Sequence, residues 1–120
     1  MQADLQSIIE TTKSKTIQEE LAHDTIEQVY IGSDFSALSE EFTNILLVTN
    51  LVHSKILELA EEFDIVAVIY TNGHKPRPKD IERAKELDID LMTSPSSIEE
   101  VTRCIRAEFG TTLDIKVKSV

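Results

Sequence analysis

The chain has 120 residues and a net charge of −10 at pH 7, from 12 Lys and Arg against 22 Asp and Glu. Nonspecific binding of nucleic acid needs a basic face, and docking on anionic lipid needs basic clusters, so the charge balance argues against both. The length is that of one domain, and 41% apolar residues suffice for a packed core. A single cysteine, Cys104, excludes an internal disulfide and a cysteine-based zinc site.

Targeting and cofactor motifs are missing from the sequence. The first residues carry neither a basic region nor an apolar stretch, and no apolar run reaches the roughly 18 residues of a membrane span. A cytoplasmic protein without membrane contact is therefore expected. Gly32, Gly73 and Gly110 stand too far apart for a dinucleotide-binding or Walker A loop, and the three histidines are widely spaced. We expect no cofactor, no metal and no enzymatic activity.

The N-terminal third predicts several short elements. Apolar residues at helical spacing predict a helix over 3–11, and a short strand is expected at 16–17. The stretch 26–31 is rich in residues that favour strands. A helix over 34–42 is expected next, because the residues at its start are good N-caps.

The central third carries the two strongest strand patterns. Residues 45–49 and 65–70 are unbroken apolar runs, the pattern of parallel strands buried on both faces. Between them, Asn50 is a suitable N-cap for an amphipathic helix over 51–63. The Asn-Gly pair at 72–73 predicts a turn after the second strand.

The C-terminal third continues the alternation of helices and strands. A helix is predicted over 78–87, with a proline in its first turn, and a short strand over 89–92. The Ser-Ser-Ile-Glu sequence at 96–99 is a capping box that opens the last helix, and Gly110 ends that helix. Residues 111–120 alternate apolar and polar side chains, which predicts a half-exposed strand.

Strands that recur about every 20–25 residues, with helices between them, are typical of βαβ units. We therefore predict an α/β fold of three layers, in which helices cover both faces of a mostly parallel sheet. Residues 1–110 would form the single domain, and 111–120 a strand-like C-terminal tail.

Polar residues follow the predicted strands at the place where ligands bind in such folds, beyond the carboxyl ends of the strands. Hydroxyl and amide side chains gather there and would supply hydrogen bonds to a ligand: Thr49, Asn50, Ser94 and Ser96. The same residue types also serve as helix caps, and that interpretation stays open.

The loop after the strand at 65–70 is basic. Five of the twelve Lys and Arg residues lie within eleven positions: Lys75, Arg77, Lys79, Arg83 and Lys85. Because a helix N-terminus favours anions, this loop predicts a site for a phosphate or carboxylate. The expected contacts are Gly73, His74, Lys75 and Arg77. The alternative is a solvated helix on which Glu82 and Glu86 pair with the basic side chains.

Two segments, 65–76 and 84–93, also resemble the DRTGG domain family and the related N-terminal domain of HPr kinase/phosphorylase. Both families have a strand, a G-x-x-P turn, a helix containing an alanine, and a second strand that ends in threonine. The matching positions are Gly73, Pro76, Ala84, Ile89, Leu91 and Thr93. Of the motif that names the family, Asp24 alone is matched, and the P-loop domain of the kinase is missing. The resemblance therefore implies the fold of the HPr kinase N-terminal domain and a bacterial regulatory role, without kinase activity.

Two functions follow as hypotheses. The first is a non-catalytic regulatory or sensory module that binds a small anionic ligand, with a nucleotide as the candidate. The alternative is a protein-interaction or oligomerisation subunit without a small ligand, because the alternating tail is suited to adding a strand to another sheet edge. A homodimer is expected in either case.

Overall fold

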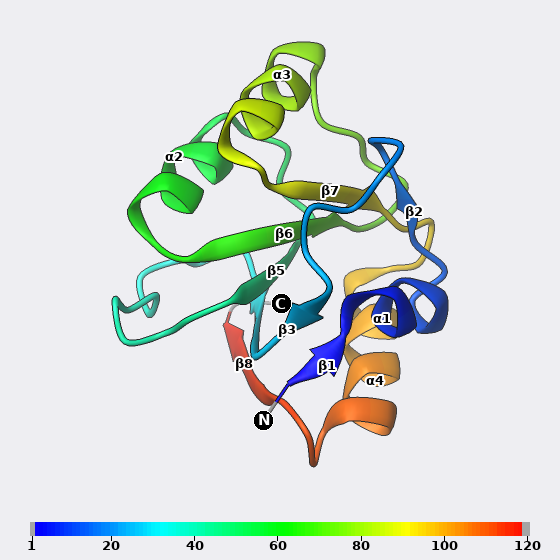
Figure 1. The fold of residues 1–120 in the computed structure, drawn as a ribbon. Helices are drawn as coiled ribbons and strands as arrows, with labels where there is room; N and C mark the ends of the chain where they lie inside the picture. Colours follow the sequence, from blue (N-terminus) through cyan, green and yellow to red (C-terminus); the bar gives the residue numbers. More distant parts are fainter. Residues whose placement is uncertain (1, 119–120) are drawn as a thin grey trace.

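The structure, a computed structural model, describes residues 2–118, which form eight strands and four helices (Figure 1). In chain order they are β1 (Ala3–Asp4), α1 (Leu5–Thr11), β2 (Lys15–Thr16), β3 (Thr25–Ile26), β4 (Gln28–Gly32), β5 (Ile45–Thr49), α2 (Lys55–Glu62), β6 (Ile65–Tyr70), α3 (Pro78–Leu87), β7 (Asp90–Thr93), α4 (Ile98–Phe109) and β8 (Asp114–Lys118).

The main sheet has six strands in the order β2-β7-β6-β5-β4-β8. Strands β7, β6, β5, β4 and β8 run parallel, while β2 pairs antiparallel with β7 at one edge. A separate ribbon of two strands joins β1 to β3. The predicted mostly parallel sheet in an α/β fold is therefore confirmed.

Helices pack against both faces of this sheet (Figure 1). Strand β5 illustrates the division, because Leu46 and Val48 join the core beneath α1 and α4, whereas Ile45 and Leu47 join the core beneath α2 and α3. Every residue of β5 and β6 is buried. This two-sided burial explains why both strands are unbroken apolar runs in the sequence.

The helix expected over 34–42 does not form, and turns occupy that stretch. The buried hydroxyl of Tyr30 accounts for the difference, since it donates to the carbonyl of Asp34 (2.6 Å) and accepts from the N–H of Ala37 (3.3 Å). The Asp34 carboxylate also accepts from the N–H of Ser36 (3.0 Å). Local side-chain bonds to the backbone thus replace the helical ladder.

The helix expected over 51–63 is shorter than predicted and begins at Lys55. Asn50 does not cap it. Instead, the Thr49 hydroxyl accepts a bond from the N–H two residues on (3.1 Å), and His53 Nδ1 accepts from the N–H of Lys55 (3.0 Å). These two bonds stabilise an irregular turn between β5 and α2, so the helix starts later than the apolar pattern suggests.

The remaining elements lie close to their predicted places. Helix α3 has the predicted bounds, and β7 is shifted by one residue from the strand expected over 89–92. The stretch 26–31 is divided between β3 and β4. The capping bond of α4 runs from the N–H of Glu100 to the hydroxyl of Ser97 (3.2 Å), one residue later than the predicted box.

The predicted C-terminal strand forms as β8 and pairs in parallel with β4. Its burial alternates, with half-buried Ile115 and Val117 between exposed neighbours. Within the described residues β8 is thus part of the main sheet, and residues 119–120 of the predicted tail lie outside the described residues, as does Met1.

Candidate functional site

The loops after β5, β6 and β7 meet at the carboxyl edge of the sheet, as predicted. The N–H of Gly73 donates to the carbonyl of Ser94 (2.8 Å), which joins the β6 loop to the β7 loop. Nδ1 of His74 lies 2.9 Å from the carbonyl of Asn50 and joins the β6 loop to the β5 loop. Because a carbonyl only accepts, His74 Nδ1 carries the proton in this contact.

Two of the predicted site residues, Thr49 and Ser94, are fully buried and engaged inside the protein. The Ser94 hydroxyl donates to the carbonyl of Thr12 (2.7 Å) and accepts from the N–H of Ser96 (3.2 Å). The Thr49 carbonyl accepts from the N–H of Thr71 (2.9 Å). These two residues hold the loops in place, and neither is a helix N-cap, since α2 and α4 have Ser54 and Ser97 at that position.

The turn predicted at 72–73 is present, with φ of 60° at Asn72 and 70° at Gly73. Its backbone donors are used within the protein, since the N–H of His74 bonds to Thr71 (3.1 Å) and that of Asn72 to Ser96 (2.8 Å). The N–H groups of Asn72, Gly73 and His74 are therefore not available to a ligand.

Three of the predicted site residues in these loops, Asn50, His74 and Lys75, have exposed side chains, and Ser96 is half-buried. Among residues 2–118, Lys75 has no carboxylate within ion-pair distance. Its ammonium is therefore available to an anion from outside the chain.

Arg77 lies at the N-terminus of α3 and is held by two neighbours. Its Nε is 3.3 Å from the carboxylate of Asp80, and a terminal nitrogen donates to the hydroxyl of Ser54 (2.5 Å). Asp80 is 4% exposed and places a carboxylate of the protein itself in the first turn of α3. The Asp80 carboxylate already supplies a negative charge at the helix N-terminus, which reduces the attraction of that helix end for a second anion.

Asp80 also influences a buried phenol. Burial raises the pKa of the Tyr70 hydroxyl, and the nearby Asp80 carboxylate raises it further.

Further along α3, Arg83 pairs with Glu61 of α2 and with Glu86 (2.9 Å). The expected pairing with Glu86 is confirmed, so part of the basic stretch is a solvated, paired helix face.

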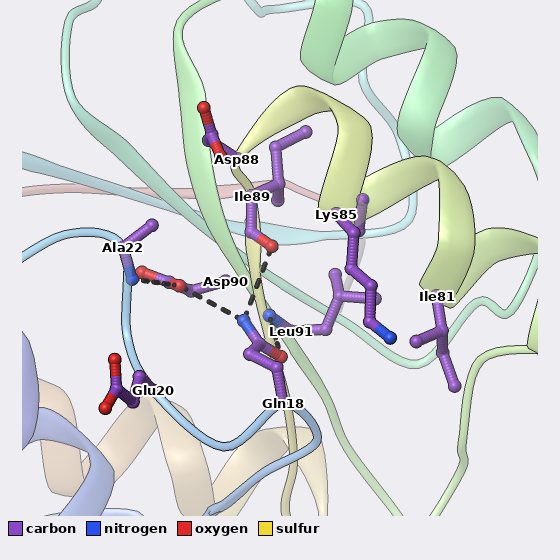
Figure 2. A pocket seen from close by; sticks show the side chains of 10 residues that line it. Gln18, Glu20, Ala22, Ile81, Lys85, Asp88, Ile89, Asp90 and Leu91 are labelled. Carbon is purple, nitrogen blue, oxygen red and sulfur yellow. Dashed lines mark hydrogen bonds between the residues drawn. The ribbon is translucent and has the colours of Figure 1, made fainter.

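A second candidate region was missed by the sequence reasoning. Residues 17–24, here called the strap, cross β7 and are fastened to it by Asp90 and Gln18 (Figure 2). A hollow of about 180 Å³ lies between the strap, β7 and α3. The one signal in the sequence is an acidic residue, Asp90, inside an otherwise apolar strand, where a carboxylate is rarely buried without partners.

The two regions differ in shape. The predicted site residues line none of four hollows formed by residues 2–118. One of them, an open groove of about 360 Å³ between α2 and α3, is lined by Ser54 and Asp80, the partners of Arg77.

Over residues 2–118, no His, Cys, Asp or Glu side chains form a group of three or more that would hold a metal ion. None of the helices described is long and apolar enough to cross a membrane.

Comparison of the sequence with known protein families and with curated proteins gave no match. Among solved structures, the fold is similar to the CBS and DRTGG domains of the regulatory region of a Clostridium perfringens pyrophosphatase, complexed with its activator diadenosine tetraphosphate. The TM-score is 0.65 at 20% sequence identity, over 85% of this chain and 45% of that chain. The chain thus spans less than half of the length of that structure, and the likeness is one of fold.

Proposed function

We propose that the chain is a cytoplasmic, non-catalytic regulatory module with a DRTGG-like domain, and that it binds a small anion of the nucleotide class. The observation that carries the proposal is that three strand-end loops are joined at Gly73 and His74, next in sequence to Lys75, which has no ion-pair partner among residues 2–118. The likeness in fold to a regulatory region solved with a nucleotide activator supports it. Nucleotide binding is a property of that complex, and its extension to this chain is our proposal.

The loop geometry suggests a division of roles among the predicted residues. Lys75 and the free edge of the Arg77 guanidinium would contact phosphate, since both lie at the N-terminal side of α3. Nε2 of His74, with its Nδ1–H bonded to Asn50, would accept a hydrogen bond from the ligand. The side chains of Asn50 and Ser96 would add hydrogen bonds, while Gly73, Thr49 and Ser94 shape the loops.

Calorimetry and thermal unfolding with adenine nucleotides, diadenosine tetraphosphate and inorganic phosphate would test this proposal. We expect binding that weakens with added salt, because a lysine contact to phosphate is electrostatic. Lys75→Gln should weaken binding by about tenfold, the scale of one charge-assisted contact.

Lys79→Gln is the matched control, because Lys79 is also exposed and also without an ion-pair partner among the described residues. It should leave the affinity unchanged. An equal loss in both variants would indicate only a general charge effect, and no binding at millimolar concentration would overturn the proposal.

The non-catalytic part of the proposal has its own test. After long incubation with the bound nucleotide, chromatography should recover the nucleotide unchanged. Conversion that follows the protein concentration and is lost in Lys75→Gln would show instead that the site is catalytic.

A second candidate function is self-association through β8. This strand ends the sheet order, so among the described residues one of its edges pairs with β4 and the other has no strand partner. Exposed strand edges can add a strand from another chain. Light scattering over a range of concentrations should then give the mass of a dimer. Removal of residues after Gly110 is a poor test, because it also deletes buried Leu113 and a strand of the sheet.

A further inference from the structure

The hollow beneath the strap has an apolar interior and a preformed wall. Ile81 and Ala84 of α3 and Leu91 of β7 line it (Figure 2). Its volume of about 180 Å³ is similar to the ~150 Å³ of a cavity that accepts a benzene-sized group. An aromatic ring or a branched aliphatic side chain is therefore the largest apolar group that it would hold.

The wall formed by the strap is fixed by Gln18, whose side-chain amide takes the place of a backbone unit in the sheet. Its Oε1 accepts from the N–H of Leu91 (3.2 Å), and its Nε2 donates to the Asp90 carboxylate (3.1 Å) and lies 3.4 Å from the carbonyl of Ile89. The Gln18 amide is thus engaged within the protein, and the hollow is open without any movement of the strap.

Charges of both signs stand around the mouth of the hollow. The ammonium of Lys85 lies on the α3 side beside Ile81, the carboxylate of Glu20 lies on the strap, and that of Asp88 lies apart from it at the end of α3 (Figure 2). All three residues are exposed, and none has an ion-pair partner among residues 2–118. On the same helix, by contrast, Arg83 is paired with two glutamates.

We propose that this hollow is a second binding site, for a small zwitterion with an apolar side chain, of the class of the branched-chain and aromatic α-amino acids. The apolar side chain would enter between Ile81, Ala84 and Leu91. The ligand carboxylate would face Lys85, and its ammonium would face one of the two acidic residues, Glu20 of the strap or Asp88 at the end of α3. A simple anion is a poorer match, because the mouth carries two carboxylates against one ammonium.

This site goes beyond the proposed nucleotide site and does not depend on it. The hollow and the loops share no residue, since Gly73, His74 and Lys75 do not line it. The strap would form one wall of the site and is also bonded to β7. A bound ligand would therefore change the chemical environment of the sheet edge where β2 pairs with β7.

Nuclear magnetic resonance of the backbone amides, with L-leucine, L-isoleucine and L-phenylalanine added to millimolar concentration, would test the site. The largest shifts are expected in the strap and around 84–91, with the loop at 72–77 unchanged. Three control compounds isolate the chemistry: 4-methylpentanoate lacks the ammonium, isoamylamine lacks the carboxylate, and glycine lacks the apolar side chain. Each should bind more weakly than L-leucine.

Lys85→Gln should weaken binding of L-leucine by about tenfold, as expected for one charge-assisted contact at a half-open rim. Lys79→Gln, on the same helix but outside the hollow, should leave it unchanged. Lys85→Gln should also leave nucleotide binding unchanged, and Lys75→Gln should leave L-leucine binding unchanged, so failure of one site is distinguishable from failure of the other. No shift with any of the three amino acids, or equal shifts with 4-methylpentanoate, would overturn the proposal.

Discussion

The carboxylate of Asp90 accepts a hydrogen bond from the backbone N–H of His23 (2.9 Å) and lies 3.3 Å from its Nδ1, although 67 residues separate the two in sequence. The same carboxylate accepts from the N–H of Ala22 (2.7 Å) and from Gln18 Nε2 (3.1 Å). Asp90 is 1% exposed, so these contacts satisfy a carboxylate that would be costly to bury alone. Asp90 thereby holds the strap against β7.

Asp90→Asn is expected to lower the free energy of unfolding by about 2–3 kcal/mol. The substitution replaces an acceptor oxygen by a donor that faces backbone N–H groups, and a buried group left without a partner costs about this much. Urea unfolding followed by circular dichroism would measure it. Asp88→Asn is the matched control, since Asp88 is exposed and its left-handed φ of 56° suits asparagine.

The control should change stability by no more than about 0.5 kcal/mol. Cleavage after Glu19 and Glu20 by a glutamate-specific protease adds a local measurement, because both residues lie in the strap and are exposed. Asp90→Asn should speed this cleavage below the unfolding transition. Equal stability of the two variants, or unchanged cleavage, would show that the strap is held by other contacts.

Gly32→Ala is expected to destabilise the sheet at β4 and β8 by more than about 3 kcal/mol, if the protein folds at all. Gly32 has a φ of +141°, and a Cβ there would clash with the carbonyl oxygen of Lys118, which belongs to backbone that cannot move without breaking the strand pairing. Thermal unfolding and the exchange rates of the β8 amides would show the loss.

Gly73→Ala separates the steric effect from the cost of the dihedral angle. Gly73 also has a positive φ of +70°, but no atom lies within 4 Å of a Cβ placed there. The expected cost is therefore only that of a left-handed alanine, about 1 kcal/mol. If both variants lost the same stability, close approach of β8 would not be the reason for glycine at position 32.

The elements that could be predicted from the sequence are those whose burial is periodic and local. Strands β5 and β6 and helix α3 have the predicted bounds, because each buries one continuous run or one helical face. The meeting of the strand-end loops could also be predicted, since parallel strands end at a common edge. The sequence could not predict that the N–H groups of Gly73 and His74 bond inside the protein, because loop conformation determines their acceptors.

The features that were missed depend on long-range polar contacts. Gln18 bonds to residues more than 70 positions away, and the strap has no periodic pattern of its own. The wrong helix at 34–42 has a more local cause, because its propensity is overridden by the hydroxyl of Tyr30, which bonds to the backbone four and seven residues further on. Local pattern analysis does not detect either contact.

Alkaline pH is expected to unfold the protein through its two tyrosines. Burial raises the pKa of Tyr30, the N–H of Ala37 lowers it in part, and the Asp34 carboxylate raises it further; burial likewise raises the pKa of Tyr70. Tyrosines of the unfolded chain ionise near pH 10. A raised pKa in the folded state leaves stability intact below pH 10 and lowers it as pH rises above that value.

Absorbance of the phenolate ion would check this directly, because the sequence contains two tyrosines and no tryptophan. In the folded protein both phenols should titrate above pH 10, with the larger displacement at Tyr70, and ionisation of Tyr70 should coincide with loss of the circular dichroism signal. Tyr70→Phe should move the alkaline transition to higher pH. A normal titration of both phenols in the folded state would contradict the expected burial effect.

Ser97→Ala is expected to lower stability by about 1 kcal/mol, because it removes the N-cap of α4. The Ser97 hydroxyl accepts from the N–H of Glu100 (3.2 Å), whereas the hydroxyl of Ser96 makes no such bond. Ser96→Ala should therefore leave the unfolding free energy within about 0.5 kcal/mol of the original. Urea unfolding of the two variants decides between Ser96, the cap predicted from the sequence, and Ser97, the cap in the structure. A larger loss in Ser96→Ala would put the cap at the earlier serine, and would also make that serine unsuitable as a probe of ligand binding.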